Sequence, residues 1–275
     1  MTQQIIGFVG GGNMAAALIG GLVDGGCSPE KIMVFDLEQT KLLALQQQYG
    51  INLAANNLFV AENADVLVFA VKPQIIHSVA NEMSAVVQAK KPIIISIAAG
   101  VRERDIESWM GGAVSLIRCM PNTPALVRSG ATALHANNYV SEDQRDIAET
   151  ILRSVGLVVW VEREDDLDAV TALSGSGPAY FFLLMEAMNR AAEELGLDKK
   201  IAQVLVEQTA LGAAKVALEV EESPADLRRR VTSPGGTTER AINVFENGGM
   251  QSLVVDALRA AHARSIEMSD ELGGK

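Results

Sequence analysis

Three glycines near the start of the chain have a spacing typical of dinucleotide-binding turns. Residues 10–15 read GGGNMA and fit G-x-G-x-x-G/A, after the apolar run 5–9 and before an alanine-rich helical stretch. In this pattern Gly10 permits a tight turn, Gly12 lets the backbone approach a pyrophosphate, and Ala15 allows close packing. We expect the phosphates on helix N-terminal amides, rather than a glycine turn without a ligand. The expected contacts are Gly10, Gly11, Gly12, Asn13, Met14 and Ala15.

An acidic residue follows at the position where such proteins hold a ribose. Asp36 ends the predicted strand 32–35, 26 positions after Gly10, and the pattern expects a carboxylate about 20 positions on. A carboxylate there would bond the ribose 2′-hydroxyl and repel a 2′-phosphate. Taken alone, Asp36 favours NADH over NADPH, and the alternative is a turn residue at a strand end.

Two further strand ends change abruptly from apolar to small or helix-breaking residues, at 69–73 and 96–100. Open α/β sheets bind ligands at the carboxyl ends of their strands, so both segments are expected to line the nicotinamide side. Lys72 beside Pro73 is interpreted as a neighbour of the cofactor, with a surface lysine as the alternative. The loop 118–124 follows another strand and should point toward the same cleft.

The second half contains one segment unlike its surroundings, VTSPGGTTE at 231–239. Its glycines leave the backbone unobstructed, and Thr237 and Thr238 begin a predicted helix. Converging amides of this kind bind a carboxylate or a phosphate; the alternative is an ordinary loop with a helix cap. The similar segment 174–178 is interpreted as a close-packing turn.

Several kinds of catalytic group are missing from these segments. There is no Ser-His-Asp order, no paired acids and no histidine near the predicted loops. Oxidation of an alcohol usually needs a general base, whereas an iminium ion already carries its proton and accepts hydride directly. Reduction of a C=N bond would need a nicotinamide, a carboxylate site and one hydrogen-bonding group.

The elements that must position these residues change character at about residue 163. Alternating strands and helices before it predict a mostly parallel α/β sheet covered on both faces, a Rossmann domain over 1–163. Only helical patterns follow, which predicts an all-α domain over 164–275. The expected strands are 5–9, 32–35, 66–71, 93–97, 116–120, 132–135 and 157–161, and the expected later helices are 166–173, 178–195, 200–220, 224–231, 238–245 and 250–272.

Two of those helices are too apolar for a small monomeric bundle. Residues 180–185 are hydrophobic on every side, and Ala202, Val206 and Val216 belong to a broad apolar stripe on the next helix. Such helices must be buried on all sides, which a domain of this size cannot do alone. We expect two subunits to interlock here; the alternative is a monomer that buries this surface against its own first domain.

Composition narrows the class of protein further. A net charge of −11 argues against binding to nucleic acid or to an anionic membrane. The first residues lack the basic flank of a signal peptide, and no apolar run of about 18 residues predicts a membrane span. Two distant cysteines and three histidines give neither a disulfide framework nor a metal pattern, which fits the cytoplasm.

Several longer stretches together resemble pyrroline-5-carboxylate reductase. They occur in that family's order over nearly the whole chain, and the SPGGTT segment is the most specific: FAVKPQ at 69–74, SIAAG at 96–100, RCMPNTPA at 118–125, TALSGSGPAYFF at 171–182 and RRRVTSPGGTTERAI at 228–242. The resemblance implies reduction of 1-pyrroline-5-carboxylate to L-proline by NADPH or NADH, the last step of proline biosynthesis. It also implies a homodimer, and often a decamer that consists of a ring of five such dimers.

The resemblance also assigns residues. It implies cofactor contacts beyond the glycine turn and Asp36, at Asn57, Ala70, Val71, Lys72, Pro73, Ile97, Ala98 and Ala99. It implies a substrate loop that includes Ser233, Gly236, Thr237 and Thr238, with Thr238 as the catalytic partner of the ring nitrogen. Glu164 would help to line the substrate site, and Glu221 is a lower-ranked acidic candidate. Members that bind NADPH often have serine where this chain has Asp36.

Two other classes of protein share parts of this pattern. A different imine or β-hydroxyacid reductase would need a lysine or aspartate on the first long helix of the second domain, where 178–195 offers Glu186 and Asn189. A dinucleotide-binding sensor would not need the anion loop. NADH oxidation with pyrroline-5-carboxylate would separate the three.

Overall fold

The alternating first part of the chain folds into one eight-stranded sheet in the computed structural model, which describes residues 4–273. The strand order is β3-β2-β1-β4-β5-β6-β7-β8, and all neighbours are parallel except β6 and β7. The predicted mostly parallel sheet is therefore confirmed. The strands are β1 Ile6–Val9, β2 Ile32–Phe35, β3 Asn52–Leu53, β4 Val66–Phe69, β5 Ile93–Ser96, β6 Leu116–Met120, β7 Gly130–Ala136 and β8 Gly156–Trp160.

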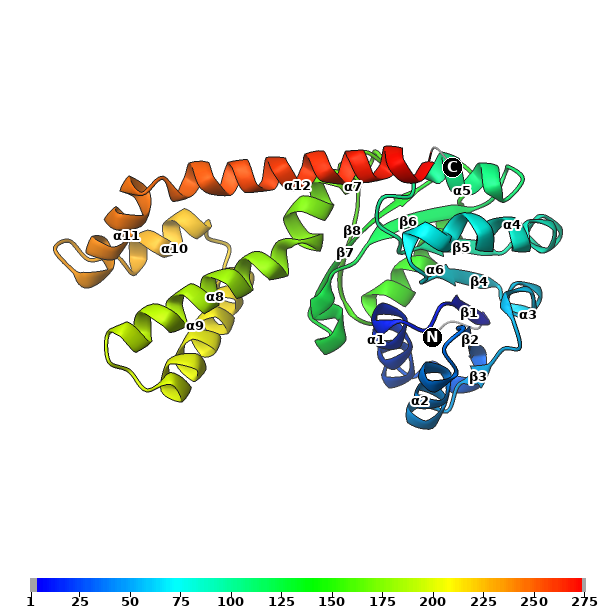
Figure 1. Cartoon of the computed structure of the whole chain (residues 1–275), viewed down its shortest axis with the longest axis horizontal. Coiled ribbons are helices and arrows are strands. Elements are labelled where there is room, and N and C mark those ends of the chain that lie inside the picture. The colour runs from blue at the N-terminus through cyan, green and yellow to red at the C-terminus, as the bar shows by residue number, and fades with distance from the viewer. Residues whose placement is uncertain (1–3, 274–275) are drawn as a thin grey trace. The chain divides into compact units, whose positions relative to one another are not determined.

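Helices cover both faces of this sheet (Figure 1). Phe8 belongs to the core beneath α1, α2 and α6, whereas its neighbour Val9 belongs to the core beneath α3, α4 and α5. Successive strand residues point to opposite faces, so strands buried on both faces are apolar throughout. The helices are α1 Asn13–Asp24, α2 Gln39–Tyr49, α3 Asn57–Asn63, α4 Pro73–Lys90, α5 Glu103–Trp109 and α6 Glu142–Arg153, with 3₁₀ turns η1 Pro29–Lys31 and η2 Thr123–Val127.

Periodicity did not predict β3, α3 or α5, because each is too short to show a repeat. Local capping and tertiary packing define them instead. The Asn56 side chain accepts a hydrogen bond from the Phe59 amide at 2.8 Å and so begins α3. Val60 then packs where a side chain at Gly7 of β1 would otherwise lie.

The chain divides into two compact units, and their limits differ from the expected ranges. Unit 1 contains the described residues up to 176 and also 261–273; unit 2 is 177–260. The helix α7 (Asp166–Val170) and the π-helical turn η3 (Thr171–Gly175) belong to unit 1, because Leu167, Asp168 and Ala172 are buried there. The last helix, α12 (Met250–Gly273), begins in unit 2 and ends in unit 1.

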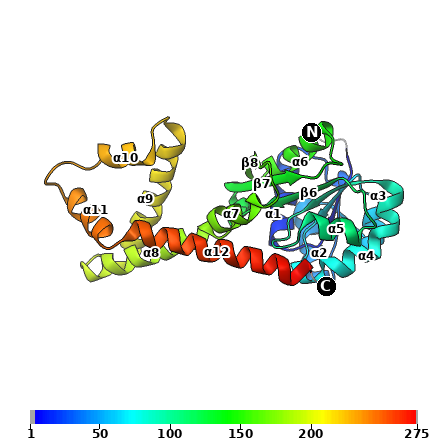
Figure 2. The ribbon, with the colours of Figure 1, turned by 90° about the horizontal axis from the view of Figure 1, so that it is seen from above.

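Unit 2 is helical and encloses little core of its own, in an open arrangement of helices (Figures 1 and 2). Its remaining helices are α8 Gly177–Glu194, α9 Lys199–Glu219, α10 Pro224–Arg230 and α11 Thr237–Asn247. Ala202 and Val206 of α9 are buried, but Phe181, Phe182 and Leu183 of α8 are each more than 60% exposed. A single copy therefore leaves a large apolar surface uncovered, as the composition of these helices predicted.

Helix α9 is long and apolar enough to cross a membrane by length and composition alone. The sequence predicted no such span, because Gln203, Glu207 and Lys215 interrupt the apolar run of α9. One helix of this kind is weak evidence for a membrane protein, and an apolar surface on unit 2 equally suits assembly with another chain.

Candidate active site

The glycine turn lies where the order of strands along the sheet reverses. β1 pairs with β2 on one side and with β4 on the other, so the loops after β1 and β4 start next to each other. The turn closes with a hydrogen bond from the Gly10 amide to the Phe35 carbonyl at 2.8 Å, and the Ala70 amide donates to the Val9 carbonyl at 2.9 Å. Open α/β sheets bind their ligands in the crevice at such a reversal.

Two of the glycines are required here for different reasons. Gly10 has φ +101°, and a Cβ on it would lie 2.6 Å from the Ala70 carbonyl oxygen, so a side chain would displace the backbone. Gly12 has an ordinary φ of −72°, and a Cβ on it would meet no described protein atom within 4 Å. The space beside Gly12 is therefore open to a ligand.

The start of α1 offers hydrogen-bond donors beside that open space. Gly12 is its N-cap, and no side chain caps the helix. Within the described chain, the amides of Asn13 and Met14 have no backbone partner, and the first helical bond is from Ala16 to Gly12 at 2.9 Å. Uncapped amides at the positive end of a helix dipole bind phosphate. The residues present thus fit the pyrophosphate of a dinucleotide.

Asp36 lies beside the glycine turn, as its position after β2 predicted. Its Oδ2 accepts a hydrogen bond from the Gly11 amide at 2.7 Å, and its Oδ1 accepts one from the Glu38 amide at 2.8 Å. Two backbone donors therefore hold this carboxylate at the turn, where a negative charge disfavours a nearby 2′-phosphate.

The other expected cofactor contacts are distributed along the same edge of the sheet. Ala70 and Val71 follow β4, Lys72 is the N-cap of α4 and Pro73 its first residue. Ile97, Ala98 and Ala99 follow β5, and the Ile97 amide donates to the Phe69 carbonyl at 3.2 Å. Asn57 is the first residue of α3, and its side-chain amide donates to Glu82 at 3.1 Å. Parallel pairing of β1, β4 and β5 places these loops in one row.

The loop 231–239 lies in unit 2 and ends in the start of α11. The Gly236 amide donates to the Ser233 carbonyl at 3.0 Å, so it is used within the turn. Among residues 4–273, the amides of Thr237 and Thr238 and the Thr238 hydroxyl have no hydrogen-bond partner. The unpaired donors of this loop are therefore those of the two threonines, whereas the Gly236 amide is bonded within the turn.

Two acidic candidates lie elsewhere. Glu221 is exposed between α9 and α10. Glu164 is in unit 1, where its Oε1 accepts hydrogen bonds from the Glu103 amide at 2.7 Å and from Arg118 at 2.8 Å. Glu164 thus joins the start of α5 to β6. Its role at the substrate site stays a prediction.

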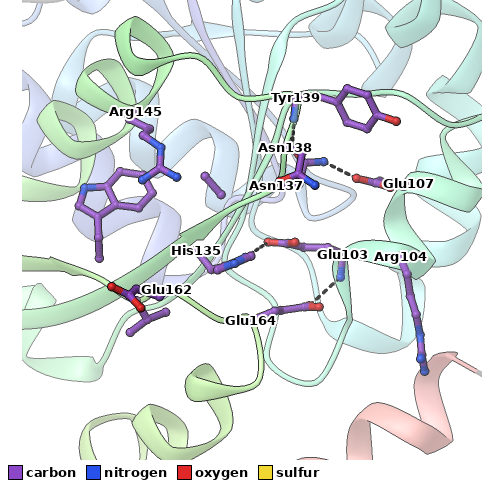
Figure 3. A pocket seen from close by; sticks show the side chains of 13 residues that line it. Glu103, Arg104, Glu107, His135, Asn137, Asn138, Tyr139, Arg145, Glu162 and Glu164 are labelled. Carbon is purple, nitrogen blue, oxygen red and sulfur yellow. Dashed lines mark hydrogen bonds and ion pairs between the residues drawn. The ribbon is translucent and has the colours of Figure 1, made fainter.

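Glu164 borders a polar pocket of about 890 Å³, which no sequence motif predicted (Figure 3). His135 of β7 lies in it with its Nδ1 2.6 Å from the carboxylate of Glu103, the first residue of α5. The hydrogen bond to this carboxylate raises the pKa of His135 above its usual 6.5. Burial raises the pKa of Glu103, against the opposing effect of the histidine. Periodicity could not show this pair, because Glu103 begins α5 and His135 belongs to β7, and only the tertiary packing of the two elements brings them together.

The raised pKa of His135 predicts a pH-dependent contribution to stability. A group with a raised folded-state pKa stabilises the fold below its unfolded pKa and loses this contribution as the pH rises through the folded value. His135→Gln should therefore lower the free energy of unfolding by about 1.5–3 kcal/mol at about pH 5.5 and by less at about pH 8.5. Urea unfolding at the two pH values measures this. His77→Gln, which removes a ring that lies 4.8 Å from that of Trp109, controls for loss of a histidine; an equal loss at both pH values for His135→Gln would contradict the assignment.

A glycine turn at the reversal point of an open, mostly parallel sheet is typical of dinucleotide-binding proteins of the Rossmann class. Comparisons with known proteins agree. Residues 5–100 match the family model described as NADP oxidoreductase coenzyme F420-dependent. Residues 164–268 match the model described as pyrroline-5-carboxylate reductase dimerisation.

Individual relatives are similar over their full length. The chain is 46% identical to a pyrroline-5-carboxylate reductase of Pseudomonas aeruginosa, over 99% of this chain and 100% of that protein. A solved pyrroline-5-carboxylate reductase of Coxiella burnetii superposes with a TM-score of 0.94 at 48% identity, covering 98% and 99% of the two chains. A Plasmodium falciparum pyrroline carboxylate reductase solved with NADP bound gives 0.86 at 28% identity, covering 98% and 99%.

The chain belongs to the pyrroline-5-carboxylate reductase family. The family resemblance inferred from the sequence is confirmed, and so are its Rossmann and helical dimerisation domains. Unit 2 lies within the stretch that matches the dimerisation model, which accounts for its uncovered apolar helices.

Proposed function

We propose that this chain reduces 1-pyrroline-5-carboxylate to L-proline with NADPH or NADH, the last step of proline biosynthesis. The observation that carries the proposal is a pair of uncapped helix starts. One, at Gly12 of α1, suits a pyrophosphate, and the other, at Thr237 and Thr238 of α11, suits a carboxylate. A dinucleotide cofactor would occupy the first site, and the carboxylate of the substrate would occupy the second.

The chain's own groups then have distinct tasks. The amides of Thr237 and Thr238 bind the substrate carboxylate, and Ser233 shapes the turn through its carbonyl. The Thr238 hydroxyl, which has no partner in the described residues, bonds the ring nitrogen and holds it as the amine forms. The nicotinamide supplies the hydride to the imine carbon. Because an iminium arrives protonated, no general base is needed, and orientation supplies most of the acceleration.

Asp36 provides a test of cofactor preference. Two like charges about 6 Å apart repel each other by about 0.7 kcal/mol at the dielectric constant of water and by about 3 kcal/mol at the lower value near a protein surface. Asp36→Ser removes the carboxylate that is held at Gly11, so the ratio of kcat/KM for NADPH to that for NADH should rise by about 3- to 100-fold. Steady-state rates with both cofactors measure the ratio.

Glu38→Gln is the matched control for Asp36→Ser. It removes an acidic charge two residues away, whose carboxylate is paired with Lys41 at 2.6 Å, and should leave the ratio near its original value. An equal change in both variants would mean that general charge, rather than the position of Asp36, sets the preference.

The proposal also covers the oligomeric state of the enzyme and its cellular compartment. We propose a homodimer formed through unit 2, supported by the exposed apolar side chains of α8 and α9. The family resemblance extends this proposal to a decamer of five dimers. The acidic chain and its two buried, free cysteines support a cytoplasmic enzyme without nucleic-acid or membrane partners. Light scattering counts the subunits directly.

The activity is tested by oxidation of NADH or NADPH in the presence of pyrroline-5-carboxylate, with proline identified as product. A β-hydroxyacid with the oxidised cofactor is the contrasting substrate. Turnover with the β-hydroxyacid and none with pyrroline-5-carboxylate would overturn the proposal.

A further inference from the structure

A buried carboxylate joins three separate segments of unit 1. Asp168 of α7 is 1% exposed. Its Oδ1 accepts a hydrogen bond from the Ser265 hydroxyl of α12 at 2.6 Å, and its Oδ2 accepts one from the Arg102 guanidinium at 2.8 Å. Arg102 also bonds Asp165 at 2.7 Å. A carboxylate removed from water in this way depends on both donors.

One of the three segments is the loop that follows β5. Arg102 ends that loop, three residues after Ala99, and is the N-cap of α5. Ile97 is bonded to Phe69 and residues 99–100 form a turn, but no amide of residues 98–102 in the described chain makes a well-formed hydrogen bond to another backbone group. Side-chain carboxylates hold the far end of the loop instead. The Arg102 guanidinium donates a hydrogen bond to Asp168, and the Glu103 backbone amide donates one to the Glu164 side chain.

The other two segments are the points where the chain leaves and re-enters unit 1. α7 precedes the passage into unit 2 at residue 177, and α12 returns at residue 261. α12 also packs directly on the loop, because a Cβ on Gly100 would lie 3.2 Å from Leu272 and 3.4 Å from Met268. Asp168 of α7 thus connects the loop after β5, through Arg102, to α12, through Ser265.

We propose that Asp168 is a positioning residue for hydride transfer, acting through Arg102 and Ser265 on the loop 97–102. This rests on the proposed contact of Ile97, Ala98 and Ala99 with the nicotinamide. Asp168 touches neither cofactor nor substrate. It keeps the loop in the place where the nicotinamide and the imine carbon align, and an error of about 1 Å in such alignment costs about 100-fold in rate.

The matched variants are Ser265→Ala and Ser269→Ala. Both serines are buried on α12, one turn apart, but only Ser265 bonds Asp168; the Ser269 hydroxyl donates to the Ser265 carbonyl at 3.1 Å within the helix. We expect kcat to fall about 3- to 10-fold for Ser265→Ala and about 10- to 100-fold for Asp168→Ala. Ser269→Ala should stay within about 2-fold of the original kcat.

Two further readouts separate positioning from a loss of stability. With cofactor deuterated at the transferred position, the isotope effect on kcat should increase in Ser265→Ala and Asp168→Ala, because hydride transfer becomes slower relative to product release. The dissociation constant of ADP-ribose should stay within about 2-fold in all variants, because its phosphates bind at α1.

The proposal fails if Ser265→Ala melts at a lower temperature but keeps its kcat and isotope effect, since Asp168 would then be only structural. If Asp168→Ala does not fold, Ser265→Ala alone decides. A double variant, Arg102→Gln with Asp168→Asn, should lose no more kcat than the worse single variant, because the two act as one unit; additive losses would overturn it. Inactivity of the unmodified chain toward pyrroline-5-carboxylate would instead count against the proposed function.

Discussion

Gly12→Val should abolish dinucleotide binding and leave the fold intact. The backbone at Gly12 has φ −72° and ψ −178°, which valine can adopt, and no described protein atom lies within 4 Å of its added Cβ. The branched side chain would fill the space in which we place the pyrophosphate. Loss of two hydrogen bonds to a charged group, at about 1.5–3 kcal/mol each, predicts a dissociation constant raised by about 10²- to 10⁴-fold.

The measurement is quenching of protein fluorescence by NADH, together with urea unfolding. Valine is a poorer N-cap than glycine, so about 1 kcal/mol of stability should be lost. Gly10→Ala is the contrasting variant: its φ of +101° and the 2.6 Å approach to Ala70 predict a much larger loss of stability. Unchanged NADH affinity in a folded Gly12→Val protein would place the cofactor elsewhere.

Thr238→Ala should lower kcat/KM for pyrroline-5-carboxylate by about 10- to 100-fold, from the loss of one hydrogen bond worth about 1.5–3 kcal/mol to a charged group. The amides of Thr237 and Thr238 at the start of α11 stay in place in this variant. The carboxylate should therefore still bind, and NADH affinity should not change, because the expected dinucleotide contacts belong to unit 1.

Thr238→Ser is the control that keeps the hydroxyl. It should retain most of the activity that Thr238→Ala loses, and both variants should unfold at similar urea concentrations. Full activity of Thr238→Ala would mean that the Thr238 hydroxyl does not bond the ring nitrogen and has no part in the reaction. Loss of NADH binding in either variant would contradict the division of work between the two units.

The sequence by itself determined the local features of this protein. The run 5–9, the glycines and the alanine-rich stretch after them predicted β1, the turn and α1, because strand, turn and helix are all encoded within about 20 neighbouring residues. The apolar character of 178–195 and 200–220 likewise predicted surfaces that one copy leaves exposed. Three short elements, β3, α3 and α5, were not predicted; Asn52–Leu53 and Asn57–Asn63, for example, are too short for a period to appear.

Only the tertiary structure decided which distant groups meet. The bond from the Gly11 amide to Asp36, the closeness of Ala70 to Gly10, and the pair of His135 with Glu103 all depend on strand order and pairing. Ser265 and Asp168 lie 97 positions apart, and only the return of α12 to unit 1 joins them. Periodicity specifies which face of an element is buried, whereas the partner that a buried polar group finds depends on how the elements pack.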